Sequence, residues 1–582
     1  MYSRCLRGFG LVVALSCCFL TVKQAVGQGL QTENAETDSI RGTVVNSLTH
    51  EPIERALVFS PDNRFATLTD SDGHFEFTFP PSSATGGGEP SAGGGPVSYP
   101  APNRPDTLMA RKPGFLEDRN RATNLSRAGK QLTLTLTPEA LIVGRIVLPS
   151  SDVSDRIQVE LYRRQVRDGR AHWVSAGTVT SRSNGEFRFA DLSAGSYKLL
   201  THELLDRDPL TFDPRGQLYG YPPVYFPNAS DFASGETIQL SAGKTFQANI
   251  SLVRQAYYQV KVKVANVPAG GGVSVVVSAR GRGSGYSLGY NNQEQTVVGM
   301  LPNGSYTLEA SSFGANSASG LLNISVKGAA VEGSRMTLVP NSSIRVNVKE
   351  EFTSRENPIL SESVGIGVGR FSLQGPRRYL NVYLEPADDF GLERPVGLRN
   401  PSERGDDSLA IDNVYPGRYW VRINSSLGFA SSVTYGGSDL QRHPLMVGAG
   451  GSSSPIEVTM SDNAAEVGGV VEGITKPASE TETLQLRSRD RLSYESSAHV
   501  YMIPLSDSSG EFRDAWVSPD GNFNLQQVPP GVYRVLAFDH PQPELEYRDA
   551  EAMRAYESKG QVIPLVAGQK EQLRLQVIST SE

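Results

Sequence analysis

The sequence is poor in cysteine, and its few cysteines lie near the N-terminus, in a segment that would be removed on export. Its 582 residues include three cysteines, Cys5, Cys17 and Cys18. Once an N-terminal segment containing them is removed, the chain can form no disulfide, no thiolate nucleophile and no zinc–thiolate site. We therefore expect the exported chain to depend on side-chain packing alone for its stability.

Long apolar runs are missing after the first 27 residues, because no later stretch approaches 18 consecutive apolar residues. We therefore expect no transmembrane segment in the mature chain. Residues 1–27 have the features of a bacterial secretory signal peptide. Arg4 and Arg7 precede an apolar stretch at 8–22, and small residues at 25–27 offer a cleavage site. The sequence thus predicts an exported protein, either periplasmic or secreted.

A membrane or cell-wall anchor is not evident either. A lipoprotein would carry its lipid on Cys17, but Ala14 stands where a large aliphatic residue usually precedes such a cysteine. The sequence also lacks a C-terminal hydrophobic tail, a Leu-Pro-x-Thr-Gly sorting motif and the terminal aromatic residue of an outer-membrane barrel. These features disfavour lipidation and a covalently attached surface stalk.

Positive charge is not in excess. Taking the three basic residues of the signal peptide from the total of 55 leaves 52 basic against 62 acidic residues, and no Lys/Arg run stands out. Nucleic-acid binding needs a basic face to contact phosphates. We therefore expect no nucleic-acid partner.

Catalytic and metal-binding motifs are also missing. No histidine has glutamate three residues later, and no Gly-x-Ser-x-Gly or Gly-Lys-Ser/Thr motif occurs. His202-Glu203 resembles the start of His-Glu-x-x-His, but Asp206 replaces the second histidine. The segment 70–73 resembles the start of a calcium loop, yet Ser82 stands where a bidentate glutamate is needed, so we interpret it as a turn. The sequence predicts no enzyme, no catalytic residue, no cofactor and no metal site.

What the sequence does contain is an internal repeat of about 110 residues. Residues 184–199 and 520–535 match position for position, with Asn-Gly or Asp-Gly, then Phe-x-Phe or Phe-x-Leu, then Gly-x-Tyr. Eroded copies at 301–308 and 414–421 keep the Gly-x-Tyr step, whose glycines are spaced by 109, 113 and 114 residues. A tight turn followed by alternating aromatic residues predicts a β-meander in each copy.

The repeat predicts an all-β fold, a tandem array of about five immunoglobulin-like or prealbumin-like β-sandwich domains after the signal peptide. The predicted domains, called units one to five below, span 38–138, 139–254, 255–340, 341–462 and 463–582. A Gly/Pro-rich insertion near 82–105 interrupts unit one. Each unit's last strand runs into the first strand of the next, so we expect a stiff rod. One helix of about three turns is predicted at 549–559.

Unit one carries a family resemblance. Residues 40–45 give a Gly-x-Val strand, 52–58 a Pro-x-x-x-Ala-x-Val strand, and 67–75 a Thr-x-x-x-Gly-x-Phe step. This pattern resembles the carboxypeptidase regulatory-like domain, a prealbumin-like sandwich grouped with carbohydrate-binding-like folds and related to Cna B-type repeats. The match is good in unit one, partial in units two and five, and weak in units three and four. The resemblance implies a fold and not a peptidase. Multi-repeat exported proteins of this type are common in soil bacteria such as acidobacteria.

The best candidate binding segment is 216–227, with the sequence Gly-Gln-Leu-Tyr-Gly-Tyr-Pro-Pro-Val-Tyr-Phe-Pro. Its tyrosines, Tyr219, Tyr221 and Tyr225, are candidate carbohydrate-binding residues, because aromatic rings stack on sugar faces and prolines stiffen the segment. The alternative is that these rings cover the edge of the core of unit two. Both interpretations stay open at this point.

Taken together, these features predict a non-catalytic exported protein with a structural, adhesive or protein-binding role in the cell envelope. Its partner would be an envelope protein or a polysaccharide. One alternative is a carbohydrate-binding protein that uses aromatic loops. A third hypothesis is an accessory chain of an envelope hydrolase system.

Overall fold

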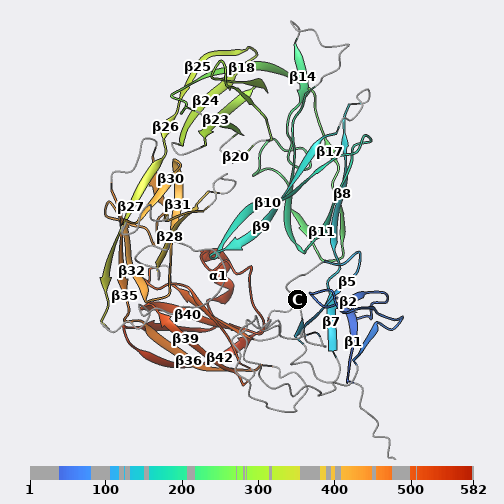
Figure 1. Ribbon diagram of the computed structural model, residues 1–582, viewed down its shortest axis with the longest axis vertical. Helices are drawn as coiled ribbons and strands as arrows, with labels where there is room; N and C mark the ends of the chain where they lie inside the picture. The colour runs from blue at the N-terminus through green and yellow to red at the C-terminus, as the bar shows by residue number, and fades with distance from the viewer. Residues whose placement is uncertain are drawn as a thin grey trace, which may run out of the picture.

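The computed structural model describes residues 38–79, 105, 107–116, 123–124, 132–149, 156–205, 217–269, 272–279, 282–283, 285–313, 317–353, 380–388, 395–399, 408–448, 454–474, 498–505, 507–518 and 520–579. The predicted signal segment, Cys17 and the insertion at 82–104 lie outside these residues. Within them the chain is almost entirely β-strand (Figure 1), which confirms the predicted all-β class.

The five units share one strand order in their first sheet. The opening strand of each unit lies between an antiparallel strand and a parallel strand that ends the unit. In the order antiparallel partner, opening strand and parallel partner, unit one has β4 (His74–Phe79), β1 (Asp38–Asn46) and β7 (Leu132–Leu136), and unit two has β11 (Glu186–Leu192), β8 (Ala140–Val147) and β16 (Thr245–Gln247) with β17 (Ile250–Ser251). Unit three has β22 (Thr296–Pro302), β18 (Gln255–Ala265) and β25 (Val331–Thr337), and unit four has β30 (Ala410–Val414), β27 (Ser342–Glu351) and β35 (Ile456–Ser461). Unit five has β39 (Asn522–Val528), β36 (Ala465–Glu472) and β42 (Lys570–Ile578).

The second sheet of each unit lies against the first. In sheet order its strands are β3 (Ala66–Leu68), β2 (Leu57–Phe59), β5 (Thr107–Arg111) and β6 (Thr123–Asn124); β10 (Arg170–Thr180), β9 (Gln158–Arg167), β12 (Gly195–Thr201) and β15 (Ile238–Leu240); β20 (Arg282–Gly283), β19 (Val273–Ala279), β23 (Gly304–Ser312), β24 (Ala318–Val326) and β26 (Val339–Pro340); β29 (Val396–Gly397), β28 (Leu380–Pro386), β31 (Gly417–Ser425) and β34 (Leu445–Val447); β38 (Arg513–Trp516), β37 (His499–Pro504), β40 (Gly531–Phe538) and β41 (Gln561–Leu565). In unit four the first sheet extends to β32 (Phe429–Tyr435) and β33 (Ser438–Asp439), and in unit three it extends to β21 (Gly289–Asn291). In unit five the parallel pair of β40 and β42 joins the two sheets into one seven-stranded sheet.

Five main hydrophobic cores fill the spaces between paired sheets. Each core takes its buried residues from one of the five predicted ranges, from the core of Ile40 and Leu136 in unit one to that of Ala465 and Leu575 in unit five. The burial follows the alternation of the strands, as in β7, where Leu132, Leu134 and Leu136 are buried and the threonines between them are exposed. The sandwich architecture is therefore confirmed, while the domain boundaries themselves stay a prediction.

The Gly-x-Tyr step of the repeat forms the same hydrogen bond in four units. Each tyrosine is buried and donates its hydroxyl to the carbonyl oxygen four residues earlier. The pairs are Tyr197 with Ser193 (2.8 Å), Tyr306 with Pro302 (3.0 Å), Tyr419 with Tyr415 (3.0 Å) and Tyr533 with Pro529 (2.6 Å). This arrangement resembles the tyrosine corner of immunoglobulin-like sandwiches. The repeat therefore persists because it closes a turn and fills a core.

We expect Tyr197→Phe to lower the free energy of unfolding of unit two by about 1 kcal/mol, because the Ser193 carbonyl loses its buried donor. Faster hydrogen exchange of the β12 amides would report the loss. Tyr219→Phe is the matched control, since that side chain belongs to the same unit and is 40% exposed. Equal exchange rates in both variants would contradict the proposed role of the corner.

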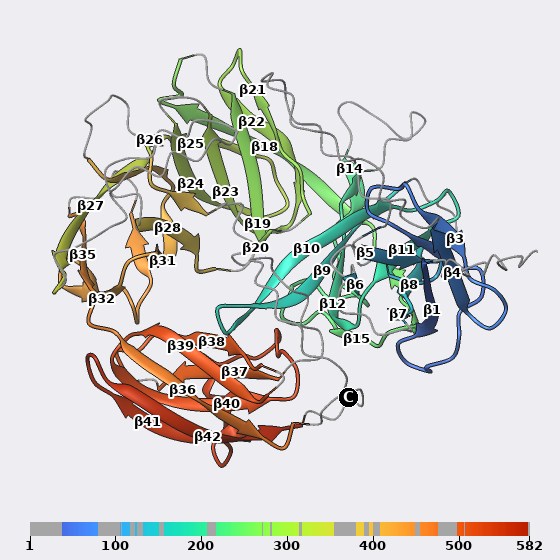
Figure 2. The same ribbon diagram turned by 60° about the horizontal axis from the view of Figure 1, so that its bottom comes forward.

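The units do not form the rod that their short junctions predicted. The chain curves back, so that unit two lies beside units four and five (Figures 1 and 2). Ion pairs join Arg164 in β9 to Glu546, and Asp168 at the β9–β10 turn to Arg422 and Arg548. The rod prediction is wrong, because it considered only contacts between neighbours in the sequence.

The predicted helix at 549–559 is shorter than expected. It consists of α1 (Ala550–Met553) followed by one 3-10 turn, η3 (Arg554–Tyr556). Asp549 caps it, since its side chain accepts hydrogen bonds from the backbone N–H groups of Glu551 and Ala552. The prediction of three α-helical turns is therefore wrong in length. Nowhere in the described part of the chain is a helix both long and apolar enough to cross a membrane.

Candidate functional site

The predicted aromatic segment is part of a sheet that joins two units. From it, β14 (Leu218–Tyr221) pairs with β13 (Leu204–Leu205) on one side and with β18 of unit three on the other. Unit two therefore extends the first sheet of unit three by two strands, β13 and β14. Backbone hydrogen bonds across this junction fix the orientation of the two sandwiches.

The structure separates the three candidate tyrosines. Tyr221 and Tyr225 are 3% and 6% exposed and contribute to the cores of unit two, whereas Tyr219 is 40% exposed. The guanidinium of Arg254 lies 4.7 Å from the centre of the Tyr219 ring. Two of the three rings thus cover the core, and only Tyr219 presents itself to solvent.

A cleft of about 680 Å³ opens between units two and three, beside this segment. One wall comes from 222–233 of unit two, and the other from β19, β22, β23 and the residues near Tyr286 in unit three. The lining residues are Pro222, Pro223, Val224, Tyr225, Asn228, Ala229, Ser230, Asp231, Phe232, Ala233, Ser251, Val253, Gln255, Ala279, Tyr286, Pro302, Asn303, Gly304, Ser305 and Tyr306. Tyr219 lies outside this lining.

Two tyrosines of unit three form the aromatic side of the cleft. The rings of Tyr286 and Tyr306 are nearly perpendicular, with centres 5.4 Å apart. Tyr306 donates to the Pro302 carbonyl, and its oxygen accepts the hydroxyl of Tyr286. Burial, and then the neighbouring tyrosines, raise the pKa of Tyr286. Burial also raises the pKa of Tyr306. Both rings are therefore neutral over the physiological range.

The opposite wall is held by a buried lysine. Lys198 of β12 is 6% exposed, and its ammonium donates to the carbonyl oxygens of Phe232 (2.6 Å) and Gly235 (2.7 Å). The same ammonium lies 4.5 Å from the centre of the Phe232 ring. These contacts tie the segment 228–235 to the sheet of unit two. Lys198 of β12 therefore holds the segment that forms this wall of the cleft.

The lining is more apolar than polar, and it is almost uncharged. Asp231 is its single charged residue among those the structure describes, and its carboxylate accepts the N–H of Ser234 at 3.0 Å. Amide and hydroxyl groups of Asn228, Ser230 and Ser305 stand beside prolines and tyrosine rings. Such a surface suits a neutral ligand rich in hydroxyl groups better than an anion.

The first two residues of the histidine motif noted in the sequence contact different partners. His202 Nε2 lies 3.3 Å from Glu160 of β9, whereas Glu203 accepts the backbone N–H of Ser287 at 2.7 Å. Burial acts to raise the pKa of Glu160, but hydrogen bonds from His202, Ser175 and Tyr162 outweigh it and lower that pKa. The side chains of His202 and Glu203 thus serve different structural contacts, and Asp206 lies outside the described residues.

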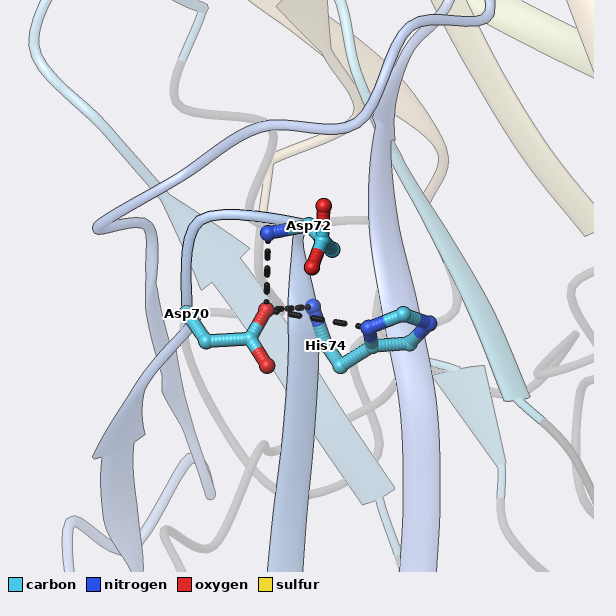
Figure 3. A group of neighbouring side chains, drawn as sticks. All are labelled: Asp70, Asp72 and His74. Atoms are coloured by element: carbon cyan, nitrogen blue, oxygen red, sulfur yellow. Dashed lines mark hydrogen bonds and ion pairs between the residues drawn. The ribbon is translucent and has the colours of Figure 1, made fainter.

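The segment 70–73 brings Asp70, Asp72 and His74 together at an exposed turn, with one ligand atom from each within 4.8 Å of the others (Figure 3). The Asp70 carboxylate already accepts the backbone N–H groups of Asp72 (3.0 Å) and His74 (2.8 Å). Unit five makes the same turn with Ser518, whose hydroxyl accepts the N–H of Asn522. The arrangement of unit one therefore follows from turn geometry.

Sequence reasoning missed most of the cleft. Tyr306 was singled out, but only as the repeat tyrosine, and no pattern marked Tyr286 or the buried state of Lys198. The proline pair at 222–223 was part of the predicted segment and does line the cleft. The signal that pointed to this region was the density of prolines and aromatic residues, rather than any one tyrosine.

The sequence matches no protein-family model and no curated protein. Among solved structures, the pilus adhesin SpaC from Lactobacillus rhamnosus GG aligns with 12% identity and a TM-score of 0.15, over 52% of this chain and 43% of that one. The Bacillus anthracis TIE protein gives 9% and 0.13, over 76% and 75%. A Streptococcal ancillary pilin gives 13% and 0.17, over 56% and 99%. The first alignment spans less than half of the adhesin, and scores this low support no functional statement.

Proposed function

We propose that this chain is an exported, non-catalytic protein of the bacterial cell envelope, built from carboxypeptidase regulatory-like sandwiches and acting as a structural or adhesive protein. The junction of units two and three carries the proposal. There, β14 joins the sheet of the next unit and fixes the two walls of the cleft. A recess formed by two rigidly joined sandwiches is suited to holding a partner.

The cleft also favours a second candidate, a carbohydrate-binding protein. Its neutral hydroxyl and amide groups can exchange hydrogen bonds with sugar hydroxyls, and Tyr286 and Tyr306 add aromatic surface to the lining. The exposed ring of Tyr219 is a separate surface on which a sugar could stack. The two locations are distinguishable by mutation.

The test is a sedimentation assay of residues 28–582 with peptidoglycan sacculi, insoluble polysaccharides and intact bacterial cells. Ser305→Trp fills the cleft from an exposed position, so we expect at least a tenfold weaker retention on the matrix that binds the wild type. Ser325→Trp is the matched control, because Ser325 is the exposed partner of Ser305 on β24 and lies outside the lining.

The outcomes separate the hypotheses. Retention on a polysaccharide that Ser305→Trp abolishes supports glycan binding in the cleft, and loss only in Tyr219→Ala moves that site to the exposed ring. Retention on cells but on no purified glycan supports the adhesive role with a protein partner. Absence of retention on every matrix contradicts adhesion.

A further inference from the structure

The second sheet of unit two carries an unusually long hairpin. Strands β9 and β10 pair from Gln158 and Thr180 to a two-residue turn at Asp168 and Gly169, whose φ angles of 45° and 68° are both left-handed. On its other side, β9 pairs with β12 only between Val159 and Arg163. The distal half of the hairpin therefore projects beyond its own sandwich, toward α1 in unit five (Figure 1).

The tip of this hairpin places one carboxylate among donors from two other units. Asp168 accepts the hydroxyl of Tyr547 at 2.5 Å and pairs with Arg548 at 3.0 Å, both from unit five. It also pairs with Arg422 of β31 in unit four. Ionised groups make the stronger hydrogen bonds in proteins, and here three donors converge on one acceptor.

The backbone of the tip is recognised as well. Gly169 accepts the backbone N–H of Arg548 at 3.1 Å, and the Asp168 carbonyl accepts Nε of Arg548 at 3.0 Å. A Cβ atom on Gly169 would lie 2.7 Å from the ring of Tyr547. That ring is itself stacked on Phe512, with centres 4.1 Å apart and planes within 6°. The contact therefore fits a glycine turn against a fixed aromatic surface.

Contacts on both flanks continue the interface. Arg164 pairs with Glu546 at 2.6 Å on the side of unit five. The guanidinium of Arg170 lies 4.0 Å from the centre of the Trp420 ring in unit four. Arg422, whose side chain is 17% exposed, is oriented by Glu385 at 2.8 Å. Contacts within units four and five thus already orient the side chains that the hairpin meets.

We propose that the β9–β10 hairpin is a latch, in which the Asp168–Gly169 tip of unit two docks on units four and five and holds the array closed. Without Asp168, Arg422 would keep its pair with Glu385, but Arg548 and Arg170 would lie close to Arg422 without the carboxylate that all three share, so the docked state would lose attraction and gain repulsion. Burial acts to raise the pKa of Asp168, but the charges of Arg422 and Arg548 outweigh it and lower that pKa. The carboxylate is therefore ionised at neutral pH. In the described part of the chain, release of the latch leaves sandwiches that contact only their neighbours in the sequence.

The latch is tested with residues 28–582 by two measurements. Small-angle X-ray scattering gives the radius of gyration, and hydrogen exchange at the Arg548 amide reports the bond to Gly169. We expect Asp168→Asn to shift the docking equilibrium about 30-fold toward the open state, which expands the particle and speeds that exchange. Tyr547→Ala should open the array from the opposite side. Asp388→Asn, which removes the exposed pair with Arg418 in unit four, is the matched control.

Three results would overturn the latch. One is an unchanged radius and unchanged Arg548 exchange in both latch variants. Another is an equal expansion in Asp388→Asn, which would reflect general loosening. The third is expansion with a doubled particle mass, because the hairpin would then dock on a second copy. Protected β40 amides in every variant would show that unit five stays folded throughout.

Discussion

Replacing Gly144 with valine is expected to unfold unit two at temperatures at which the other units remain folded. Gly144 lies in β8, where an added Cβ would fall 1.8 Å from the Ala248 carbonyl oxygen and 2.6 Å from the tip of the Phe187 ring. The carbonyl belongs to the backbone beside the parallel strands of the unit and has no room to move aside. We expect a loss of about 3 kcal/mol or more in the free energy of unfolding. Scanning calorimetry should show the transition of unit two at a lower temperature.

The neighbouring Arg145→Ala is the matched control for Gly144→Val. Arg145 occupies the same strand but points outward, where its guanidinium pairs with Glu186 at an exposed site. Exposed ion pairs contribute little to stability, so this variant should unfold close to the wild type. If Gly144→Val and Arg145→Ala unfolded at the same temperature, β8 would be able to move away from Ala248 without a loss of stability, and the prediction would be wrong.

The same close approach recurs in two other units, which explains part of what could be predicted. Added Cβ atoms on Gly42 and Gly469 would lie 2.3 Å from the Leu132 carbonyl and 2.2 Å from the Leu573 carbonyl. A glycine in close contact with a neighbouring carbonyl thus marks the central strand of the first sheet in units one, two and five, whereas β18 and β27 contain no glycine. Turn glycines, alternating strands and the repeat tyrosine all depend on short-range geometry, and these were predictable.

The layers outside the second sheets were not predictable from alternation. In β12 and β40 the chain was expected to bury one face, yet the consecutive residues Leu199 and Leu200 are both buried, as are Val535 and Leu536. After each of these strands an insertion, described at 222–237 in unit two and at 539–560 in unit five, folds back over the outer face. Alternation of apolar and polar residues shows which face of a strand a side chain is on, but not whether another segment covers the outer face.

The curvature of the array could not be predicted either, because it depends on contacts between distant residues. Tyr547 and Asp168 are separated by 379 positions in the sequence, and neither belongs to a recognisable motif. The insertion of unit five supplies Tyr547, and the insertion of unit two supplies a wall of the cleft. Some of the residues that distinguish this chain from a plain row of sandwiches thus lie in the two insertions, which the repeat pattern does not describe, and others lie in the β9–β10 hairpin and in β31.

Lys198→Met is expected to lower the free energy of unfolding of unit two by about 2 kcal/mol and to loosen the cleft wall. The ammonium bonds to the carbonyls of Phe232 and Gly235, and methionine would leave both without that charged donor. Removing a buried charge also removes its desolvation cost, which offsets part of the loss. The measurements are calorimetry of unit two and hydrogen exchange over 228–235.

Lys244→Met is the matched control, since Lys244 is an exposed lysine of the same unit. If Lys198→Met speeds exchange at 228–235 while Lys244→Met does not, the lysine holds the wall that the cleft requires. Ligand retention should then fall in Lys198→Met even though Lys198 does not line the cleft. Unchanged exchange in both variants would mean that the T-shaped contacts of Phe232 with Tyr225 and Trp173 suffice to hold the wall. The insertion would then bury Lys198 without depending on it to stay in place.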